Sequence, residues 1–195
     1  MIRKALMAFL GAAALLLAVP ASAHKPSDSY LTLTAAGPQV DGQWDIALRD
    51  LDMGIGLDTD GNGELTWDEV RLRHGAIAAY ALSRLKISSG GAACPLQVTS
   101  HMLDDHTDGA YAVMRLRASC AGDVAAMDID YGLLFDIDPQ HKGLLKLEHA
   151  GQATTAIFTP DAPRQQIQLA RASRRRQFGD HARHGVSHIW SRFDH

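Results

Sequence analysis

Two cysteines, Cys94 and Cys120, set the tightest constraint on how this chain folds. They stand on either side of two runs, 95–103 and 110–119, in which apolar and polar residues alternate as they do in β-strands. Between the runs lies a turn-like cluster, 105–109, of Asp, His, Thr, Asp and Gly. The simplest interpretation is one hairpin with a disulfide across its open end. The alternative is a redox or metal-binding thiol pair, but the chain has no Cys-x-x-Cys sequence.

Period-two alternation continues through much of the remaining chain. Two alternating runs around Ala36-Gly37-Pro38 predict a further hairpin, and Trp67–Lys86 has apolar residues at helical spacing. We therefore predict a mainly β (α+β) fold, namely an antiparallel β-sandwich-like domain with one helix inserted. The other strands are expected at Ser29–Thr34, Gln43–Leu51, Ala125–Asp138, Gly143–Leu147, Ala153–Phe158 and Gln166–Leu169.

The first 23 residues have the pattern of a secretory signal peptide. Arg3 and Lys4 precede a short apolar stretch, and residues 21–23 form a small-residue cleavage site. Cleavage would make His24 the first residue of an extracytoplasmic domain, 24–170, and would place the cysteines where they can pair. An uncleaved anchor helix is the alternative, although the apolar run is short for one. We predict a periplasmic or otherwise extracytoplasmic protein.

The last segment, 171–195, differs from the body in charge. It is rich in arginine and histidine, whereas the preceding body is acidic, and the formal net charge of the whole chain is −3. This balance excludes a generally basic nucleic-acid binder. The run Arg174-Arg175-Arg176 is either a solvated linker or a segment that meets an anionic membrane surface.

The strongest motif is the twelve-residue stretch Asp58–Glu69. Its oxygen-bearing side chains stand at alternate positions, a glycine occupies the sixth position, and a glutamate closes it, as in an EF-hand calcium loop. Calcium prefers six to eight oxygen ligands, and Gly63 permits the sharp turn. The predicted calcium ligands are Asp58, Asp60, Asn62, Glu64 through its carbonyl, Thr66 directly or through water, and Glu69 with both carboxylate oxygens. An acidic turn that caps a helix at Trp67 is the alternative.

The surroundings of this loop depart from a full EF-hand. The preceding segment, Trp44–Leu57, alternates like a strand, and loops started at Asp104 or Asp138 fail at later ligand positions. A lone loop predicts an affinity in the weak extracellular range, about 10⁻⁴ to 10⁻³ M. We therefore expect calcium to act as a structural staple here more than as a signal. Leu65 should point into the core.

Several segments together resemble the extracytoplasmic N-terminal domain of HupE/UreJ-type membrane proteins. They are the mature start from His24 to Leu31, the run from Gln43 to Asp52, the calcium loop, Phe135–Pro139 with Leu144-Leu145, and Phe158-Thr159-Pro160. The tail from His188 to His195 looks like the family's His-x5-Asp-His signature. The resemblance implies a first transmembrane helix at that signature, linked to transport of nickel or a related metal.

Two features depart from that family. The sequence stops at His195, where the family continues into several membrane helices, and Arg192 stands where a small residue is expected. A charge there is costly inside a bilayer. Transport is therefore not assigned to this chain. Three functional hypotheses follow. The first is a calcium-binding domain that lies beside a membrane permease. The others are a partial or non-functional fragment of a metal transporter and a periplasmic copper or nickel carrier.

Histidines supply the candidate ligands for a transition metal. His184 and His188 would share a helix face, and Asp194 and His195 lie about two turns further on. Imidazoles suit Ni²⁺ or Cu²⁺, and the alternative is a basic tail with scattered histidines. An N-terminal His24 is a second copper candidate. We expect His74 to be exposed, and surface or turn positions for His101, His106, His141 and His149.

Motifs for catalysis are missing from the sequence. It has no nucleophile elbow, no phosphate loop and no metalloprotease helix. Asp128 and Asp130 would share one strand face, as would Asp136 and Asp138, and a solvated face is the simpler explanation than acid–base catalysis. We predict a non-catalytic protein with no small-molecule substrate identified and no nucleic-acid partner.

Overall fold

The computed structural model describes residues 27–169. The predicted signal peptide, His24 and the tail 171–195 lie outside the described residues. The tail includes the predicted metal ligands His184, His188, Asp194 and His195.

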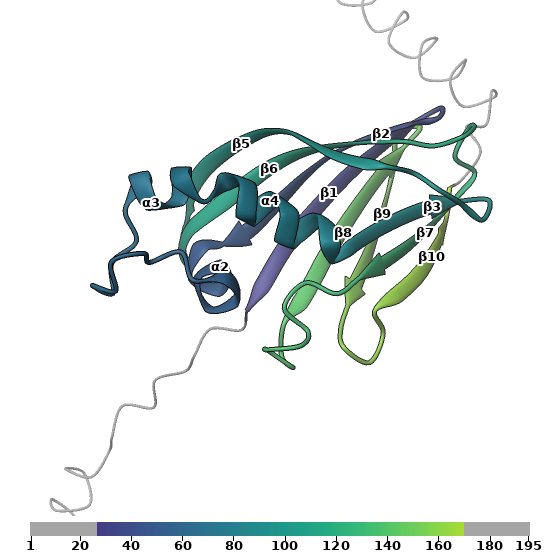
Figure 1. Ribbon diagram of the computed structural model, residues 1–195. Helices are drawn as coiled ribbons and strands as arrows, with labels where there is room; N and C mark the ends of the chain where they lie inside the picture. The colour runs from purple at the N-terminus through teal and green to yellow at the C-terminus, as the bar shows by residue number, and fades with distance from the viewer. Residues whose placement is uncertain (1–26, 170–195) are drawn as a thin grey trace, which may run out of the picture.

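Ten strands form two facing sheets (Figure 1). The larger sheet has the order β5-β6-β2-β1-β8-β9, and the smaller has the order β10-β7-β3-β4. The strands of the larger sheet are β1 (Asp28–Ala36), β2 (Gln39–Ala47), β5 (Leu96–His106), β6 (Gly109–Ser119), β8 (Lys142–His149) and β9 (Gln152–Phe158). Those of the smaller sheet are β3 (Leu85–Ser89), β4 (Ala92–Ala93), β7 (Ala126–Tyr131) and β10 (Arg164–Gln168).

The mainly β fold class is confirmed, with one departure from a purely antiparallel arrangement. Strands β1 and β8 pair in parallel, with Asp28 opposite Lys142, and every other pair of neighbouring strands is antiparallel. The two strands are far apart in sequence, so no local turn forces them to run in opposite directions. The larger sheet is therefore mixed.

Alternation places the apolar residues between the sheets. Leu31, Leu33 and Ala35 of β1 face inward, and Trp44, Tyr131 and Phe158 are completely buried. The ring of Tyr131 meets that of Trp44 edge-on, with centroids 5.6 Å apart, and stacks on Phe158 at 5.3 Å. Inward-facing residues of both sheets belong to one continuous core.

Within residues 27–169, three helices precede the smaller sheet, where the sequence predicted one. They are α2 (Leu48–Ile55), α3 (Trp67–Leu72) and α4 (His74–Ser83), and α4 lies across the larger sheet where the smaller one does not reach (Figure 1). The predicted helix Trp67–Lys86 breaks at Arg73 and ends at Ser83, and β3 begins at Leu85. Leu72, one of the apolar residues at helical spacing, is 83% exposed.

The predicted strand Gln43–Leu51 is wrong at its end, because β2 stops at Ala47 and α2 begins at Leu48. Leu48 and Leu51 are three residues apart and both are buried, so they share one face of the helix. The predicted strand Ala125–Asp138 is also too long. β7 stops at Tyr131 and a turn follows, in which Leu134 has a φ of 61°.

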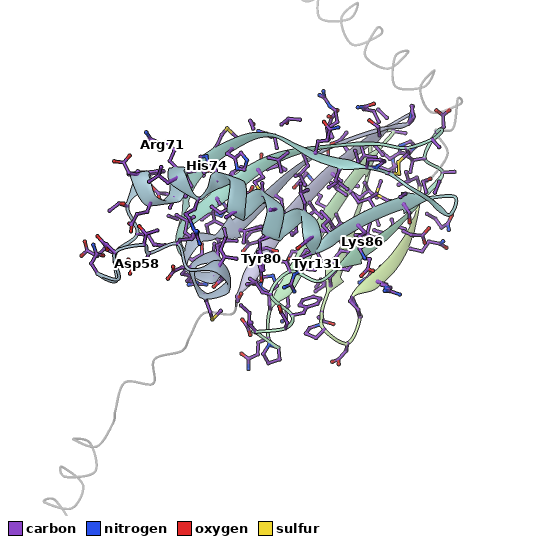
Figure 2. The ribbon with its side chains drawn as sticks, in the orientation of Figure 1. Asp58, Arg71, His74, Tyr80, Lys86 and Tyr131 are labelled. Carbon is purple, nitrogen blue, oxygen red and sulfur yellow. A yellow bond between two sulfur atoms is a disulfide. The ribbon has the colours of Figure 1, made fainter. Side chains whose placement is uncertain are left out.

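The predicted hairpin with its disulfide is confirmed. Strands β5 and β6 pair from Leu96 to His106, and Cys94 is bonded to Cys120 at the open end. The disulfide lies at the opposite end of the molecule from Asp58 (Figure 2). Within residues 27–169, no helix has the length and apolar character needed to cross a bilayer.

Candidate metal centre

The acidic loop 58–69 connects α2 to α3, so it lies in a helix–loop–helix unit (Figure 1). The prediction of a strand before the loop is therefore wrong. Helix α2 ends because Gly56 adopts a left-handed φ of 64°, and the Gly56 amide donates to the Asp52 carbonyl at 2.7 Å. The Asp52 carboxylate then accepts hydrogen bonds from the amides of Leu57 and Asp58, at 2.6 and 2.9 Å. The chain consequently enters the loop in a defined direction.

Three carboxylates of this loop converge. One oxygen from each of Asp58, Asp60 and Glu69 lies within 4.8 Å of the other two. Asp58 projects from the end of the molecule in Figure 2. Three like charges at this separation repel one another, and a divalent cation between them would relieve the repulsion.

Backbone amides hold the first half of the loop around its own side chains. The Asp58 carboxylate accepts from the amides of Gly61 and Gly63, at 2.7 and 2.8 Å, and these bonds hold its pKa below the usual value. Gly61 and Gly63 both have positive φ, at 72° and 83°. Only glycine adopts this conformation without steric cost, so the tight turn depends on them.

The residues in the middle of the loop are also held by hydrogen bonds within the loop. The Asp60 carboxylate accepts from the Asn62 amide at 3.1 Å, and the Asn62 side-chain oxygen accepts from the Glu64 amide at 2.7 Å. The Glu64 side chain is exposed. Leu65 packs against the core, as predicted.

Glu69 closes the loop and is the most enclosed of the three carboxylates, at 7% exposure. One oxygen accepts from the Thr66 amide and hydroxyl at 3.0 and 2.7 Å, and the other accepts from the Thr59 amide and hydroxyl at 2.8 and 3.0 Å. These bonds, those from Thr66 foremost, lower the pKa of Glu69 to about 2. Thr66 also caps α3 by accepting from the Glu69 amide. Glu69 is thus ionised and fixed in orientation.

The donor chemistry of this site fits a hard cation. The converging groups are carboxylate oxygens, and neither sulfur nor imidazole takes part. Such donors suit a hard cation such as Ca²⁺ or Mg²⁺.

A buried polar cluster beside α2 has no counterpart among the features predicted from the sequence. His141, expected at the surface, is completely buried, because the chain after β7 folds back over the core. Its Nδ1 lies 2.6 Å from the Ser27 hydroxyl, and its Nε2 lies 3.1 Å from the Tyr131 hydroxyl. Burial is the main reason that the pKa of His141 falls to about 4. No local pattern around His141 signals these contacts, since Ser27 is 114 residues away.

The remaining histidines contact other groups of the protein, and His74 is less exposed than expected. His74 is half-buried and its ring stacks on His101 with centroids 4.8 Å apart. His106 stacks on Tyr111 at 4.1 Å, and His149 bonds the Ala35 carbonyl at 3.0 Å. Within the described residues, none of these four belongs to the converging carboxylate group.

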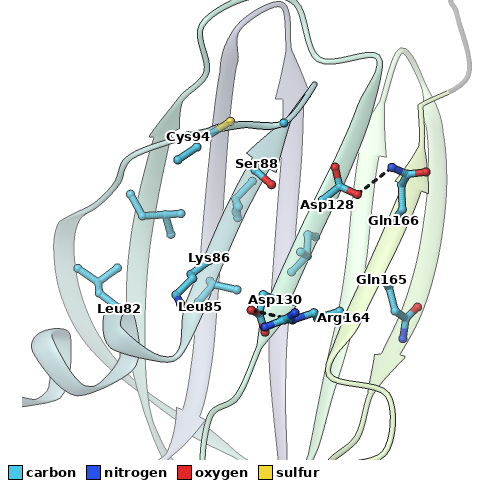
Figure 3. Close-up of a pocket in the computed structure, with 15 residues that line it drawn as sticks. Leu82, Leu85, Lys86, Ser88, Cys94, Asp128, Asp130, Arg164, Gln165 and Gln166 are labelled. Carbon is cyan, nitrogen blue, oxygen red and sulfur yellow. Dashed lines mark hydrogen bonds and ion pairs between the residues drawn. The ribbon is translucent and has the colours of Figure 1, made fainter.

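The predicted acidic strand face lies on the outer side of the smaller sheet, in an open groove of about 770 Å³ (Figure 3). Asp130 pairs with Arg164 at 3.0 Å, and Asp128 accepts from the Gln166 amide group at 2.8 Å. Each carboxylate therefore has a partner on the neighbouring strand β10. Asp136, from the other predicted pair, bonds Arg84 at 2.9 Å.

No protein-family model matches the chain, and a search of curated proteins finds none that is similar to it. The likeness to the HupE/UreJ extracytoplasmic domain consequently stays a prediction from the motifs, and the candidate site is interpreted from its own geometry.

Proposed function

We propose that this protein is an exported, non-catalytic calcium-binding domain of the HupE/UreJ extracytoplasmic type. The observation that carries the proposal is the convergence of Asp58, Asp60 and Glu69 in a loop between two helices. The side chains of Asp58, Asp60, Asn62 and Glu69, with the Glu64 carbonyl and Thr66, would hold the ion. Bound calcium would supply the positive charge that keeps the two ends of the loop together.

Location outside the cytoplasm is part of the same proposal. It is supported by the paired cysteines, which persist in oxidising compartments, and by the signal-peptide pattern at residues 1–23. In such compartments calcium is abundant, so a weak site would be filled. A place beside a membrane permease follows from the family resemblance.

Calcium titration of the purified protein tests the site. Trp67 lies within the loop, is 56% exposed and should report binding by a change in fluorescence. With a dissociation constant of about 10⁻⁴ to 10⁻³ M, calcium at about 10 mM should raise the unfolding free energy by roughly 1–3 kcal/mol, visible as a higher Tm.

Two substitutions that each replace a glutamate with uncharged glutamine separate the effect of losing a ligand from the effect of losing a negative charge in the loop. Glu69→Gln removes the charge of the enclosed carboxylate and should abolish both the fluorescence change and the Tm shift. Glu64→Gln removes the same charge from an exposed side chain of the same loop and should leave both effects in place. If millimolar calcium changes neither signal in the unmodified protein, the loop is only an acidic helix cap and the proposal is wrong.

A further inference from the structure

Arg73 joins the two helices that flank the loop. It stands at the break between α3 and α4, where its backbone has φ −94° and ψ 1°. Its amide donates to the carbonyls of Glu69 and Val70, both at 3.1 Å, and its own carbonyl accepts from the Ile77 amide at 2.9 Å. The backbone of Arg73 is thereby fixed to α3, the helix that begins inside the loop and carries Glu69.

The side chain of Arg73 reaches back to the other helix. Its Nη2 donates to the carbonyls of Ile55 and Gly56, at 2.7 and 3.0 Å, although these residues are 18 and 17 positions away. The last carbonyls of a helix lack partners within it, and they carry the negative end of its dipole. One guanidinium therefore closes the C-terminal end of α2, from an anchor on α3.

These contacts bear on the geometry of the ligands. The end of α2 directs the chain into Asp58, through Gly56 and Asp52, while Glu69 sits on α3 four residues before Arg73. The first and last ligands of the loop thus belong to the two bodies that Arg73 links. The Arg73 Nε is buried and has no hydrogen-bond partner among the described residues, so the guanidinium is held by the two carbonyl contacts of its Nη2.

We propose that Arg73 is a positioning residue for the calcium loop, holding the entering and exiting helices at the separation that lets Asp58 and Glu69 meet one ion. This inference rests on the proposed function. It predicts an effect whose sign is opposite to that of simple electrostatics. A positive charge near the loop repels Ca²⁺, so removing it should tighten binding by Coulomb's law, whereas losing a positioning contact should weaken binding.

The test is calcium titration by calorimetry of the unmodified protein, Arg73→Met and Arg71→Met. Arg71 is on the same helix and carries the same charge, but within residues 27–169 its exposed side chain pairs with Asp68 alone, at 3.7 Å. We expect Arg73→Met to weaken calcium binding about 10- to 100-fold, as for outer contacts of other metal sites. Arg71→Met should bind as the unmodified protein does, or slightly more tightly.

Two further variants separate positioning from charge and from stability. Arg73→Lys keeps the charge but replaces the planar guanidinium with a compact ammonium on a flexible stem, so it should recover only part of the lost affinity. The double variant Cys94→Ala/Cys120→Ala lowers stability at the far end and should leave calcium affinity unchanged. Far-UV circular dichroism confirms that each variant is folded, and Arg73→Gln replaces Arg73→Met if the latter is not.

The outcomes distinguish the two ideas. If the unmodified protein does not bind calcium, the proposed function fails and this inference fails with it. If it binds calcium and Arg73→Met binds as tightly or more tightly, the loop is a calcium site that does not depend on Arg73, and only this inference is overturned. Weakening of the disulfide variant to the same extent as Arg73→Met would also overturn it, because loss of stability would then explain both.

Discussion

At the scale of single residues, the buried cluster around His141 has a defined order of hydrogen bonds. An indole N–H can only donate and a carboxylate can only accept, so the ends set the direction. The proton of neutral His141 is therefore assigned to Nδ1. The Trp44 indole donates to the Ser29 hydroxyl (3.5 Å), and Ser29 donates to the Tyr131 hydroxyl (2.5 Å). Tyr131 donates to Nε2 of His141 (3.1 Å). His141 Nδ1 donates to the Ser27 hydroxyl (2.6 Å), which donates to the Asp50 carboxylate (2.8 Å). This run connects the core to α2.

Acid should therefore weaken the fold through His141. Its pKa is about 4 in the folded protein and about 6.5 in an unfolded chain, so the unfolded chain binds more protons between these values. The contribution of His141 to the free energy of unfolding should be fully present above about pH 6.5 and should fall by roughly 3 kcal/mol by pH 4. Urea unfolding between pH 7 and 4 measures the slope.

A His141→Gln variant provides the control for this prediction, since it cannot titrate there. It should be less stable at pH 7 but should lose the slope between pH 6.5 and 4. Glu69 affects stability at lower pH, because folding lowers its pKa from 4.5 to about 2. Its contribution to stability is lost only as the pH drops through that range. An equal slope in the variant and the unmodified protein would assign the effect to other groups.

At the scale of elements, sequence patterns predicted those features that depend on residues close together in the chain. The hairpin β5–β6, the hairpin β1–β2 and the ligand loop follow from alternation, turn residues and spacing. Helix α2 was missed because its eight residues continue the alternating run of β2, and a short apolar pattern suits both periods. The contacts of Arg73 with α2 were missed because they join residues far apart in the chain.

Glycine substitutions should separate the end of α2 from the first turn of α4. Gly56→Ala places a side chain at a left-handed φ of 64°, with no atom within 4 Å of the new Cβ, so the cost of about 1 kcal/mol is conformational. Gly75→Ala lies within α4, also in open space, and should stabilise by roughly 0.5 kcal/mol.

Urea unfolding of both variants checks the opposite signs of these effects. Calcium affinity should also fall in Gly56→Ala, because the end of α2 directs the chain into Asp58, and should stay the same in Gly75→Ala. Equal stability changes in the two variants would contradict the role given to the left-handed turn.

At the scale of the whole molecule, the fold class could be predicted and the arrangement of its strands could not. Cys94 and Cys120 indicated which two strands pair, whereas nothing local indicates that β1 lies beside β8 or that the turn after β7 covers His141. The candidate calcium ligands were predicted from twelve consecutive residues. The helices and the arginine that position them depend on tertiary contacts.

The disulfide should stabilise the sandwich without affecting the loop. It closes a segment of 26 residues at the end opposite Asp58, and the chain-entropy model assigns it roughly 3–4 kcal/mol. Cys94→Ala/Cys120→Ala should lower the unfolding free energy by that amount in urea. The calcium-induced rise in Tm should persist, and its loss would show that the two ends are coupled.

The parallel pairing of β1 with β8 determines when the larger sheet can be completed. A chain made from its N-terminus exposes the free edge of the β1–β2 hairpin until residues 142–149 have also been made, 114 positions after the start of β1. During that interval the edge is an open template for other extended chains. The newly made chain is therefore vulnerable to aggregation until residues 142–149 emerge, and a factor that shields this edge would protect it.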